Sequence, residues 1–310
     1  MSSILYGKDI LRTDILSDDE LKLILSTAAR FEKAFKTKGR LDNMAGQVMA
    51  ALFFEPSTRT RLSFESAMLR LGGGAITVAD AKTSSAAKGE SLADTARTVS
   101  GYADVIVMRH PQKGSAQEAA DAVQVPVINA GDGAGQHPTQ ALLDIYTIQK
   151  EKGSLEGLTF ALAGDLKYGR TVHSLAYLLI RFGVRFLFVS PPGLEMPTEI
   201  TAELRKMGAA VSETNDLAAA VRESDVVYMT RIQRERFTDP AEYERLKGSY
   251  VVDMAMVRQA KPGVIIMHPL PRVDEIATEV DAYEGAAYFR QTVNGVFVRM
   301  ALLALVTGKE

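Results

Sequence analysis

Residues Val48-Met49-Ala50-Ala51-Leu52-Phe53-Phe54-Glu55-Pro56-Ser57-Thr58-Arg59-Thr60-Arg61 form the stretch around which the rest of the chain is organised. Its first seven residues are an apolar run of strand length, which predicts a buried strand. Apolar residues then return at roughly helical spacing, at Leu62, Phe64, Ala67, Met68 and Leu71. The stretch therefore predicts a strand, a tight turn and a helix whose N-cap is Ser57.

The start of this predicted helix concentrates groups that bind anions. A helix N-terminus offers unpaired backbone N–H groups and the positive end of the helix dipole. Ser57, Thr58 and Thr60 add hydroxyl donors. Arg59 and Arg61 add positive charge, which the dipole disfavours at this end unless an anion is present. An ordinary cap with two solvated arginines is the alternative; we favour a site for a phosphate-sized dianion.

The bulk composition limits the function classes. A chain of 310 residues exceeds the usual size of one domain and predicts two. The 36 basic residues nearly balance the 38 acidic ones, so no surface for nucleic acid or anionic membrane is expected. The absence of cysteine excludes disulfides, thiolate metal sites and a cysteine nucleophile. The N-terminus lacks a signal-peptide pattern, and no apolar run approaches the roughly 20 residues needed to span a bilayer, which favours a cytoplasmic protein.

Predicted helices and strands alternate along the whole chain. Ser17-Asp18-Asp19-Glu20 has the form of a capping box that starts an amphipathic helix. Further strands are predicted at 75–79, 104–109, 126–130, 158–165, 184–190, 225–231 and 264–268, and further helices near 91–102, after 138, at 170–182 and at 288–305. This alternation predicts an α/β fold of two Rossmann-like lobes, each a mainly parallel sheet flanked by helices.

The second lobe is expected to begin near Gly153. The predicted organisation is a first domain over 1–136, an interdomain helix over 137–150 and a second domain over 151–287. A glycine-rich connection at 131–135 leads into the interdomain helix, and Pro138 fits its first turn because its missing N–H costs little there.

Several arginines fall at predicted strand ends or helix starts, where α/β sheets bind ligands. Arg109 ends one strand, and Arg170 begins a helix. Arg231 and Gln233 lie two residues apart, on one face of a strand end. A surface arginine is more often simply solvated, but the repeated placement favours binding of carboxylates and phosphates by planar guanidinium groups. One lobe is thus predicted to bind phosphate and the other to bind carboxylates.

Two other chemistries are disfavoured. The segment 164–170 follows a strand and opens a helix, but it lacks the G-x-G-x-x-G spacing of a dinucleotide site. The four histidines include no pair at the one-turn spacing of a helical metal site, so neither a metal nor another cofactor is expected. His137, between a glycine-rich loop and a helix, is the best candidate for a catalytic histidine. His268-Pro269-Leu270-Pro271 ends a strand with rigid backbone that can aim carbonyl oxygens at a donor, although a plain turn is the alternative.

Six motifs together resemble the carbamoyltransferase family, and within it the aspartate carbamoyltransferases, over essentially all of the chain. They are Ser57-Thr58-Arg59-Thr60-Arg61, Val107-Met108-Arg109-His110-Pro111, His137-Pro138-Thr139-Gln140, Lys167-Tyr168-Gly169-Arg170-Thr171-Val172-His173-Ser174-Leu175, Met229-Thr230-Arg231-Ile232-Gln233 and His268-Pro269-Leu270-Pro271-Arg272. The first is shared by carbamoyltransferases generally. The last two distinguish the aspartate enzymes, since ornithine carbamoyltransferases carry a cysteine as the second residue of the last motif.

The resemblance implies attack of the L-aspartate amine on carbamoyl phosphate, giving N-carbamoyl-L-aspartate and phosphate, the committed step of de novo pyrimidine biosynthesis. It also implies residue roles. The expected carbamoyl-phosphate ligands are Ser57, Thr58, Arg59, Thr60, Arg109, His137, Gln140 and the backbone carbonyls of Leu270 and Pro271, with a cis bond between the last two. The expected aspartate ligands are Arg109, Arg170, Thr171, Arg231 and Gln233. Arg59, Thr60, Arg109 and His137 are the expected catalytic residues.

The resemblance further implies that the C-terminal helix over 288–310 completes the first domain. It also implies a homotrimer whose sites are shared between subunits. Ser84 and Lys88 occupy the positions of a loop that reaches the neighbouring site, where Lys88 meets both substrates. Two departures from relatives stand nearby: Ala87 replaces a second lysine found in some, and Pro56 replaces a small residue.

Two alternatives remain open at this point. One is a carbamoyltransferase for another amino acid, although a neutral Gln233 beside Arg231 suits a dicarboxylate better than ornithine. The other is a non-catalytic scaffold of the pyrimidine pathway. Whether a regulatory chain or a dihydroorotase partner binds is not decided by the sequence.

Overall fold

The apolar run that opens the chain's central stretch is β1 (Val48–Phe53), an inner strand of a four-stranded parallel sheet in the computed structural model. The structure describes residues 3–80, 88–133, 135–232 and 239–310. The sheet has the order β2-β1-β3-β4. The other strands are β2 (Gly74–Val78), β3 (Val105–His110) and β4 (Val127–Asp132). Because every pair is parallel, all four carboxyl ends lie at one edge.

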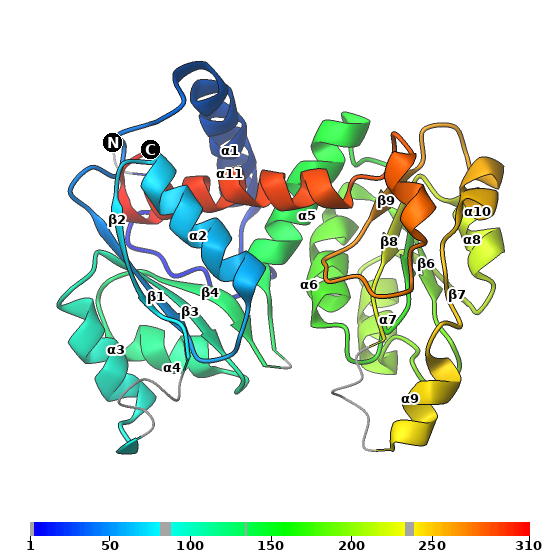
Figure 1. Cartoon of the computed structure of the whole chain (residues 1–310), viewed down its shortest axis with the longest axis horizontal. Helices are drawn as coiled ribbons and strands as arrows, with labels where there is room; N and C mark the ends of the chain where they lie inside the picture. Colours follow the sequence, from blue (N-terminus) through cyan, green and yellow to red (C-terminus); the bar gives the residue numbers. More distant parts are fainter. Residues whose placement is uncertain (1–2, 81–87, 134, 233–238) are drawn as a thin grey trace. The chain divides into compact units, whose positions relative to one another are not determined.

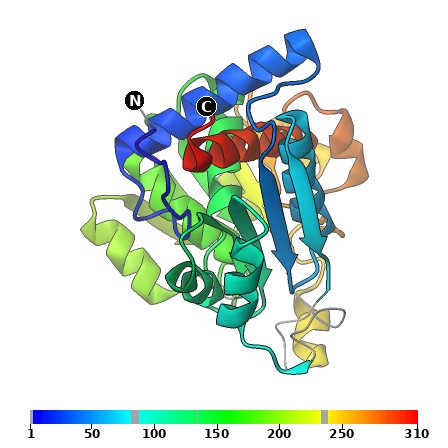
Figure 2. The ribbon, with the colours of Figure 1, turned by 90° about the vertical axis from the view of Figure 1, so that its left-hand side faces the viewer.

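Helices cover both faces of this sheet, as parallel sheets require. In Figure 1, α3 and α4 lie on one face and α2 on the other, while Figure 2 faces this part of the chain and shows β1 and β2 side by side. The helices are α1 (Asp18–Lys38), α2 (Thr58–Arg70), α3 (Leu92–Ser100), α4 (Ser115–Ala122), α5 (Pro138–Lys152) and α11 (Tyr288–Thr307).

The second sheet has five parallel strands in the order β7-β6-β5-β8-β9. They are β5 (Thr159–Ala163), β6 (Arg185–Val189), β7 (Ala210–Thr214), β8 (Val226–Met229) and β9 (Ile265–Met267). The accompanying helices are α6 (Arg170–Leu179), α7 (Thr198–Lys206), α8 (Leu217–Glu223), α9 (Pro240–Leu246) and α10 (Met254–Gln259), with 3₁₀ helices at Ile180–Phe182 and Thr278–Ala282.

Each sheet forms the centre of its own unit. Unit 1 comprises Met1–Leu143 and Val293–Glu310, and unit 2 is the continuous segment Asp144–Thr292. In unit 1 one face of the sheet packs small and branched side chains of β1 and β3 against alanines of α3 and α4. In unit 2 one face of β5, β6 and β8 packs against α8 and α10. The two mainly parallel sheets confirm the predicted fold class.

The first long helix illustrates how local sequence sets an element. The Ser17 hydroxyl accepts a hydrogen bond from the Glu20 N–H at 3.2 Å, and the Glu20 carboxylate accepts one from the Ser17 N–H at 2.8 Å. These two bonds form the predicted capping box. At the other end, Gly39 adopts φ 74° and its N–H donates to the Phe35 carbonyl. Glycine closes the helix because it enters the left-handed region without a steric penalty.

Ser57 is the N-cap residue of α2, as predicted, although its side chain makes no capping hydrogen bond. Two local predictions need correction. Leu62, predicted on the apolar face of that helix, is 50% exposed. Gly131 and Asp132 belong to β4 rather than to the connection after it, because Asp132 pairs in register with His110.

The last helix, α11, combines length with a high mean hydropathy. Among the described residues, α11 is long and apolar enough to cross a membrane by length and composition. However, 72% of the residues in its apolar window are buried inside the protein, as in the core helix of a folded domain. Arg290 and Arg299 interrupt the apolar residues of this helix, so the sequence contains no unbroken apolar run of about 20 residues there, as expected.

Candidate active site

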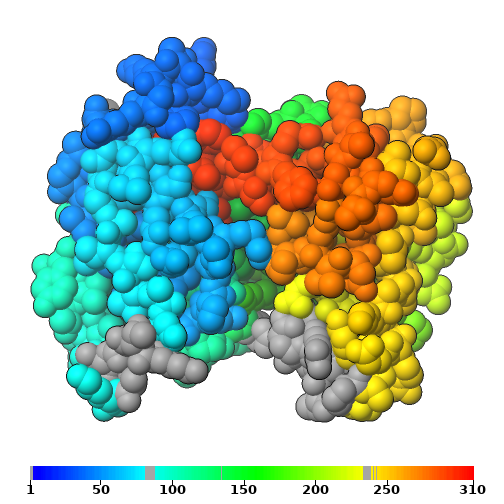
Figure 3. Space-filling view, in the orientation of Figure 1, coloured from blue at the N-terminus to red at the C-terminus, as the bar shows by residue number. Residues whose placement is uncertain are grey.

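The N-terminus of α2 carries the first group of predicted site residues. Ser57 is half-buried, Thr58 and Arg59 are exposed, and Thr60 is buried. No side chain caps this helix start, so its first-turn N–H groups are not satisfied by a cap and are suited to an anion. Arg61 instead forms an ion pair with Glu65 one turn later, at 3.1 Å between Nη1 and Oε1. The outer surface of α2 belongs to the visible face in Figure 3.

Arg109 is the last residue but one of β3. It lies in register with Phe53 of β1, and its carbonyl accepts a hydrogen bond from the Phe54 N–H at 2.8 Å. The side chain is 9% exposed. Its Nη1 donates to the Ala130 carbonyl at 3.1 Å, and its Nη2 lies 3.3 Å from Oε2 of Glu55. The guanidinium is thus fixed at the carboxyl edge of the sheet, and its partner Glu55 was not predicted from the sequence.

The loop from β4 to α5 places the third group. Pro138 is the first residue of α5, as predicted, and the His137 carbonyl accepts from the Gln140 N–H at 3.1 Å. His137 and Gln140 are 5% and 9% exposed. Both sequence-predicted residues therefore lie buried at a helix start, where His137 is held by the first turn.

Asp132 fixes the loop that leads to His137. Its Oδ1 accepts hydrogen bonds from the Gln136 N–H at 2.6 Å and from Asn129 Nδ2 at 3.1 Å, and its Oδ2 accepts from the Gly114 N–H at 2.8 Å. A Cβ at Gly135 would lie 2.6 Å from the Asp132 carboxylate, so the loop requires glycine there. These contacts of Asp132 were not predicted from the sequence, where 131–135 is a glycine-rich connection.

These three groups belong to one unit and to one edge of its sheet. β1, β3 and β4 are parallel; β1 ends before α2, β3 ends one residue after Arg109, and β4 ends before His137. Ligands of parallel α/β sheets bind beyond the carboxyl ends of the strands. Unit 1 therefore gathers a helix N-terminus, a buried arginine and a histidine at one edge of its sheet, and all three are groups that can donate hydrogen bonds to anionic oxygens.

In unit 2, the loop after β5 presents Arg170 and Thr171 at the start of α6, both half-buried. The Asp165 carboxylate accepts a hydrogen bond from the Tyr168 N–H at 2.9 Å. His173 holds the same loop from α6, with its Nε2 2.6 Å from the Leu166 carbonyl. Burial lowers the pKa of His173 despite that bond, so Nε2 carries the proton of a neutral ring and donates it.

Arg231 lies just beyond β8, half-buried, next to a small pocket of unit 2. The Thr230 hydroxyl anchors this strand end by donating to the Ala163 carbonyl at 3.1 Å. The described residues that line the pocket include Thr230, Arg231, Tyr243, Lys247 and Tyr250. Lys247 and Tyr243 were not found by sequence reasoning, because neither belongs to a motif or a strand end.

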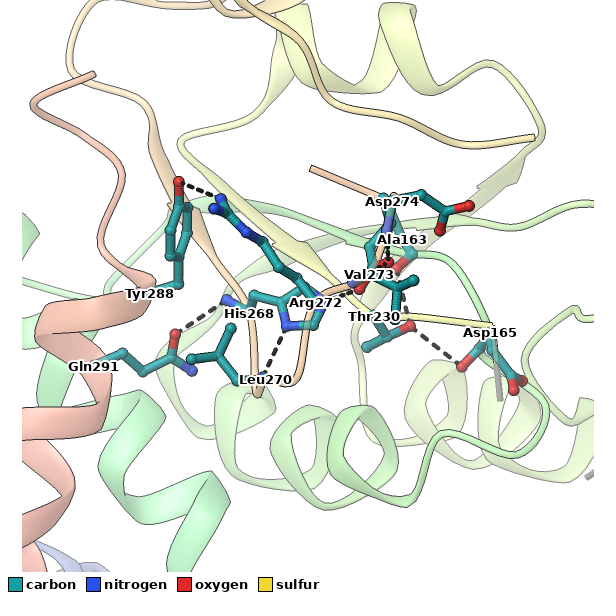
Figure 4. A network of polar contacts seen from close by, with 11 residues as sticks. Ala163, Asp165, Thr230, His268, Leu270, Arg272, Val273, Asp274, Tyr288 and Gln291 are labelled. Atoms are coloured by element: carbon teal, nitrogen blue, oxygen red, sulfur yellow. Dashed lines mark hydrogen bonds and ion pairs between the residues drawn. The ribbon is translucent and has the colours of Figure 1, made fainter. Parts of the chain in front are cut away.

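The His-Pro-Leu-Pro segment follows β9 in the same unit. The Leu270–Pro271 peptide bond is cis, as the resemblance implied, and Leu270 has φ 51°. His268 is 1% exposed; its Nδ1 accepts from the Leu270 N–H at 2.8 Å, and its Nε2 lies 2.6 Å from Oε1 of Glu275. Figure 4 shows His268 and Leu270 in this network, with Gln291 on the other side of the histidine.

Three predicted site residues require separate mention. Ser84 and Gln233 lie outside the residues that the structure describes. Lys88 is described and exposed, shortly before Ser91, which caps α3 by accepting from the Asp94 N–H at 3.1 Å. Within the described ranges, no group of three or more histidine or acidic residues is arranged to hold a metal ion.

Comparison with known proteins supports the interpretation of both units. Residues 8–150 match the family described as aspartate/ornithine carbamoyltransferase, carbamoyl-P binding domain, and residues 156–306 match the family described as its Asp/Orn binding domain. The aspartate carbamoyltransferase catalytic subunit of Thermococcus gammatolerans is 55% identical over 302 residues, which cover 97% of this chain and 98% of that protein.

Solved structures agree with the sequence relatives. The catalytic subunit of M. jannaschii aspartate transcarbamoylase superposes with a TM-score of 0.90 at 51% identity, covering 96% of this chain and 97% of that one. Aspartate transcarbamoylase of Trypanosoma cruzi in complex with N-(phosphonacetyl)-L-aspartic acid superposes with a TM-score of 0.93 at 44% identity, covering 98% and 97%. The chain therefore belongs to the aspartate/ornithine carbamoyltransferase family, among the catalytic subunits of the aspartate enzymes.

Proposed function

We propose that the chain catalyses attack of the L-aspartate amine on the carbonyl carbon of carbamoyl phosphate, through the residues gathered at the two strand-end edges. The products are N-carbamoyl-L-aspartate and phosphate. The observation that carries the proposal is the juxtaposition in unit 1 of the uncapped α2 N-terminus, the buried Arg109 and the α5 start at His137. Family membership, with relatives named for this reaction, supports it independently.

Carbamoyl phosphate is assigned to unit 1. Ser57, Thr58, Arg59 and Thr60 bind the phosphate, where backbone N–H groups, hydroxyls and one guanidinium supply hydrogen bonds and charge. Arg61 is left out of this group because it is paired with Glu65.

Stabilisation of the reacting carbonyl is assigned to three donors. The carbonyl oxygen gains negative charge as the amine attacks, and Thr60, Arg109 and His137 donate hydrogen bonds to it. Each fixed donor of this kind is worth about 3 kcal/mol in a transition state. Arg109 suits the task because the Ala130 carbonyl and Glu55 already fix its orientation, so little reorganisation is needed.

The carbamoyl amine is assigned to acceptors. Gln140 and the backbone carbonyls of Leu270 and Pro271 accept its N–H groups. The bond from nitrogen to the carbonyl carbon forms, the bond from that carbon to the phosphate oxygen breaks, and the amine proton passes to the departing phosphate. No side-chain base is required, because the phosphate itself accepts the proton.

Aspartate is assigned mainly to unit 2. Arg170 with Thr171, Arg231 with Gln233, and Arg109 bind its two carboxylates, since guanidinium groups match carboxylates in a planar, two-point geometry. The half-buried placement of Arg170 and Arg231 at strand and helix ends supports this assignment.

We further propose a cytoplasmic homotrimer in which Ser84 and Lys88 of one subunit complete the site of its neighbour and which serves pyrimidine biosynthesis. The exposure of Lys88 is consistent with a role outside its own subunit's core. Mixing inactive Lys88→Ala chains with inactive Arg59→Ala chains should restore part of the activity, because one site in a mixed trimer then receives both intact residues. Confirmed mixed trimers without restored activity would contradict shared sites.

The reaction is tested by incubating the purified chain with carbamoyl phosphate and either L-aspartate or L-ornithine. Carbamoyl-aspartate and phosphate should appear in equal amounts, and ornithine should react far more slowly. Absence of product, or a preference for ornithine, would contradict the proposed function.

A further inference from the structure

The buried surroundings of His268 determine which of its ring nitrogens carries the proton. The Leu270 N–H can only donate, and it lies 2.8 Å from Nδ1, so Nδ1 is the acceptor. The proton is then on Nε2, which faces Oε1 of Glu275 at 2.6 Å. Burial lowers the pKa of His268, although the hydrogen bond to Glu275 opposes this, which keeps the ring neutral.

Both ends of this contact hold the segment that follows β9. Oε2 of Glu275 accepts hydrogen bonds from the N–H groups of Val273 and Asp274, each at 3.1 Å. His268 and Glu275 are 1% and 5% exposed. The turn from Leu270 to Asp274 is therefore held by hydrogen bonds at both ends: to the His268 imidazole at its start and to the Glu275 carboxylate at its end.

A second set of buried contacts fixes His268 itself. Its backbone N–H donates to Oε1 of Gln291 at 3.0 Å, as Figure 4 shows. Nε2 of Gln291 donates to Asp144 at 2.6 Å, and the Tyr228 hydroxyl donates to the other oxygen of that carboxylate at 2.7 Å. Asp144, Tyr228 and Gln291 are all at most 1% exposed. The histidine is thus the link between the core of unit 2 and the turn.

We infer that His268 is a positioning residue for carbamoyl transfer: as the neutral Nε2–H tautomer it holds the Leu270 N–H and so fixes the Leu270 and Pro271 carbonyls that accept the carbamoyl amine. The inference rests on the proposed role of those two carbonyls. A hydrogen bond from residue i to the N–H of residue i+2 constrains the peptide between them, which is why it can fix Leu270 at φ 51°.

Two substitutions test the roles of the two His268 ring nitrogens separately. In His268→Asn, the side-chain oxygen lies near the position of Nδ1 and keeps an acceptor for the Leu270 N–H. In His268→Gln, the side-chain amide reaches the position of Nε2 and keeps the bond to Glu275 but leaves the Leu270 N–H without its acceptor. Circular dichroism first establishes that both variants are folded. If His268 had only a structural role, the two folded variants would then have the same activity.

Two ligands separate recognition of the amine from recognition of the phosphate. Phosphonoacetamide keeps the NH₂ group that the carbonyls would accept, whereas phosphonoacetate presents a carboxylate there. We expect the wild-type chain to prefer phosphonoacetamide. His268→Asn should keep that preference and a kcat within about threefold of wild type. His268→Gln should bind phosphonoacetamide about tenfold more weakly and have a kcat about tenfold lower, while its affinity for phosphonoacetate stays nearly unchanged.

The outcomes distinguish the inference from the proposed function. If the wild-type chain binds both ligands equally, the carbonyl role is wrong and the inference falls with it. If the wild type discriminates but His268→Gln matches His268→Asn, only the inference is overturned. Imidazole ¹⁵N shifts of the wild-type chain decide the matter without variants: Nδ1 should be unprotonated and Nε2 protonated between pH 6 and 8, and a protonated Nδ1 would overturn the inference.

Discussion

At the residue scale, the two arginines that open α2 have different surroundings. Arg59 lies in the exposed first turn, whereas Arg61 is turned toward Glu65, whose Oε1 also accepts from the Thr77 hydroxyl at 2.7 Å. Arg61 is therefore part of the helix surface, whereas Arg59 is the arginine that we propose as a phosphate ligand.

This difference predicts opposite effects of two matched substitutions. Arg59→Ala should lower kcat by about two to three orders of magnitude with the fold intact, because the phosphate loses its charge partner. Arg61→Ala should leave kcat nearly unchanged and lower the free energy of unfolding by about 0.5 kcal/mol, the usual value for an ion pair one turn apart on a helix. Steady-state kinetics and urea denaturation measure both effects; near-normal turnover in Arg59→Ala would refute the phosphate assignment.

Asp132 is the residue on which the position of His137 depends. Asp132→Asn replaces one carboxylate oxygen by an NH₂ group that must face an N–H donor, from either Gly114 or the Gln136 side of the loop. We expect a loss of about 1 to 3 kcal/mol in the free energy of unfolding and a kcat lowered about tenfold or more, because a small displacement of His137 weakens its hydrogen bond in the transition state.

The matched control for this substitution is Asp121→Asn. Asp121 is exposed and accepts only a side-chain hydrogen bond from Gln117 in α4, at 2.8 Å. The Asp121→Asn substitution should change neither the free energy of unfolding nor kcat appreciably. Equal effects of the two substitutions would mean that Asp132 is not a positioning residue.

At the element scale, the sequence predicted those strands and helices whose burial follows a simple period. β1 is an apolar run followed by a capping residue, and α1 carries its own capping box and a terminal glycine. β7 was not predicted, because Ala210–Thr214 lies at the sheet edge with mostly exposed side chains and therefore lacks an apolar pattern. The seven-residue helix α8 is likewise too short to show one.

The candidate site was predicted where a residue belongs to a strand end or a recognised motif. Arg109, His137 and Arg170 lie at such ends. The residues that hold them were missed because some of their contacts are distant in sequence: Glu55 pairs with Arg109, and Asp132 accepts a hydrogen bond from the Gly114 N–H, 18 positions away. Only the folded sheet brings these groups together, so no local pattern could reveal them.

At the scale of the whole molecule, buried neutral histidines make stability depend on pH. Burial lowers the pKa of both His173 and His268 in the folded chain, while in the unfolded chain both titrate near 6.5. Below that pH the unfolded state binds more protons, so the free energy of unfolding falls as pH falls. The stabilising contribution of these two neutral rings is fully present above about pH 6.5. It is lost as the pH falls toward the lower pKa values that the two histidines have in the folded chain.

Urea denaturation at pH 5.5, 6.5 and 7.5 checks this prediction. We expect the midpoint to rise with pH over this range. His173→Gln should flatten the dependence, because the glutamine amide can still donate to the Leu166 carbonyl but does not titrate. A midpoint that is constant, or highest at pH 5.5, would contradict the assignment of neutral buried rings.

Unit 1 is formed by two segments that are distant in sequence, which affects how the chain folds during translation. Its last piece, Val293–Glu310, supplies the Val306 carbonyl to the Gly7 N–H at 2.9 Å and the Arg299 guanidinium to the Ser63 hydroxyl at 3.0 Å. The ribosome must therefore synthesise all of Asp144–Thr292 before the last piece of unit 1 becomes available to pack against the first. At ordinary translation rates that interval is about 7 to 30 s, during which the apolar surface later covered by α11 is open to chaperones.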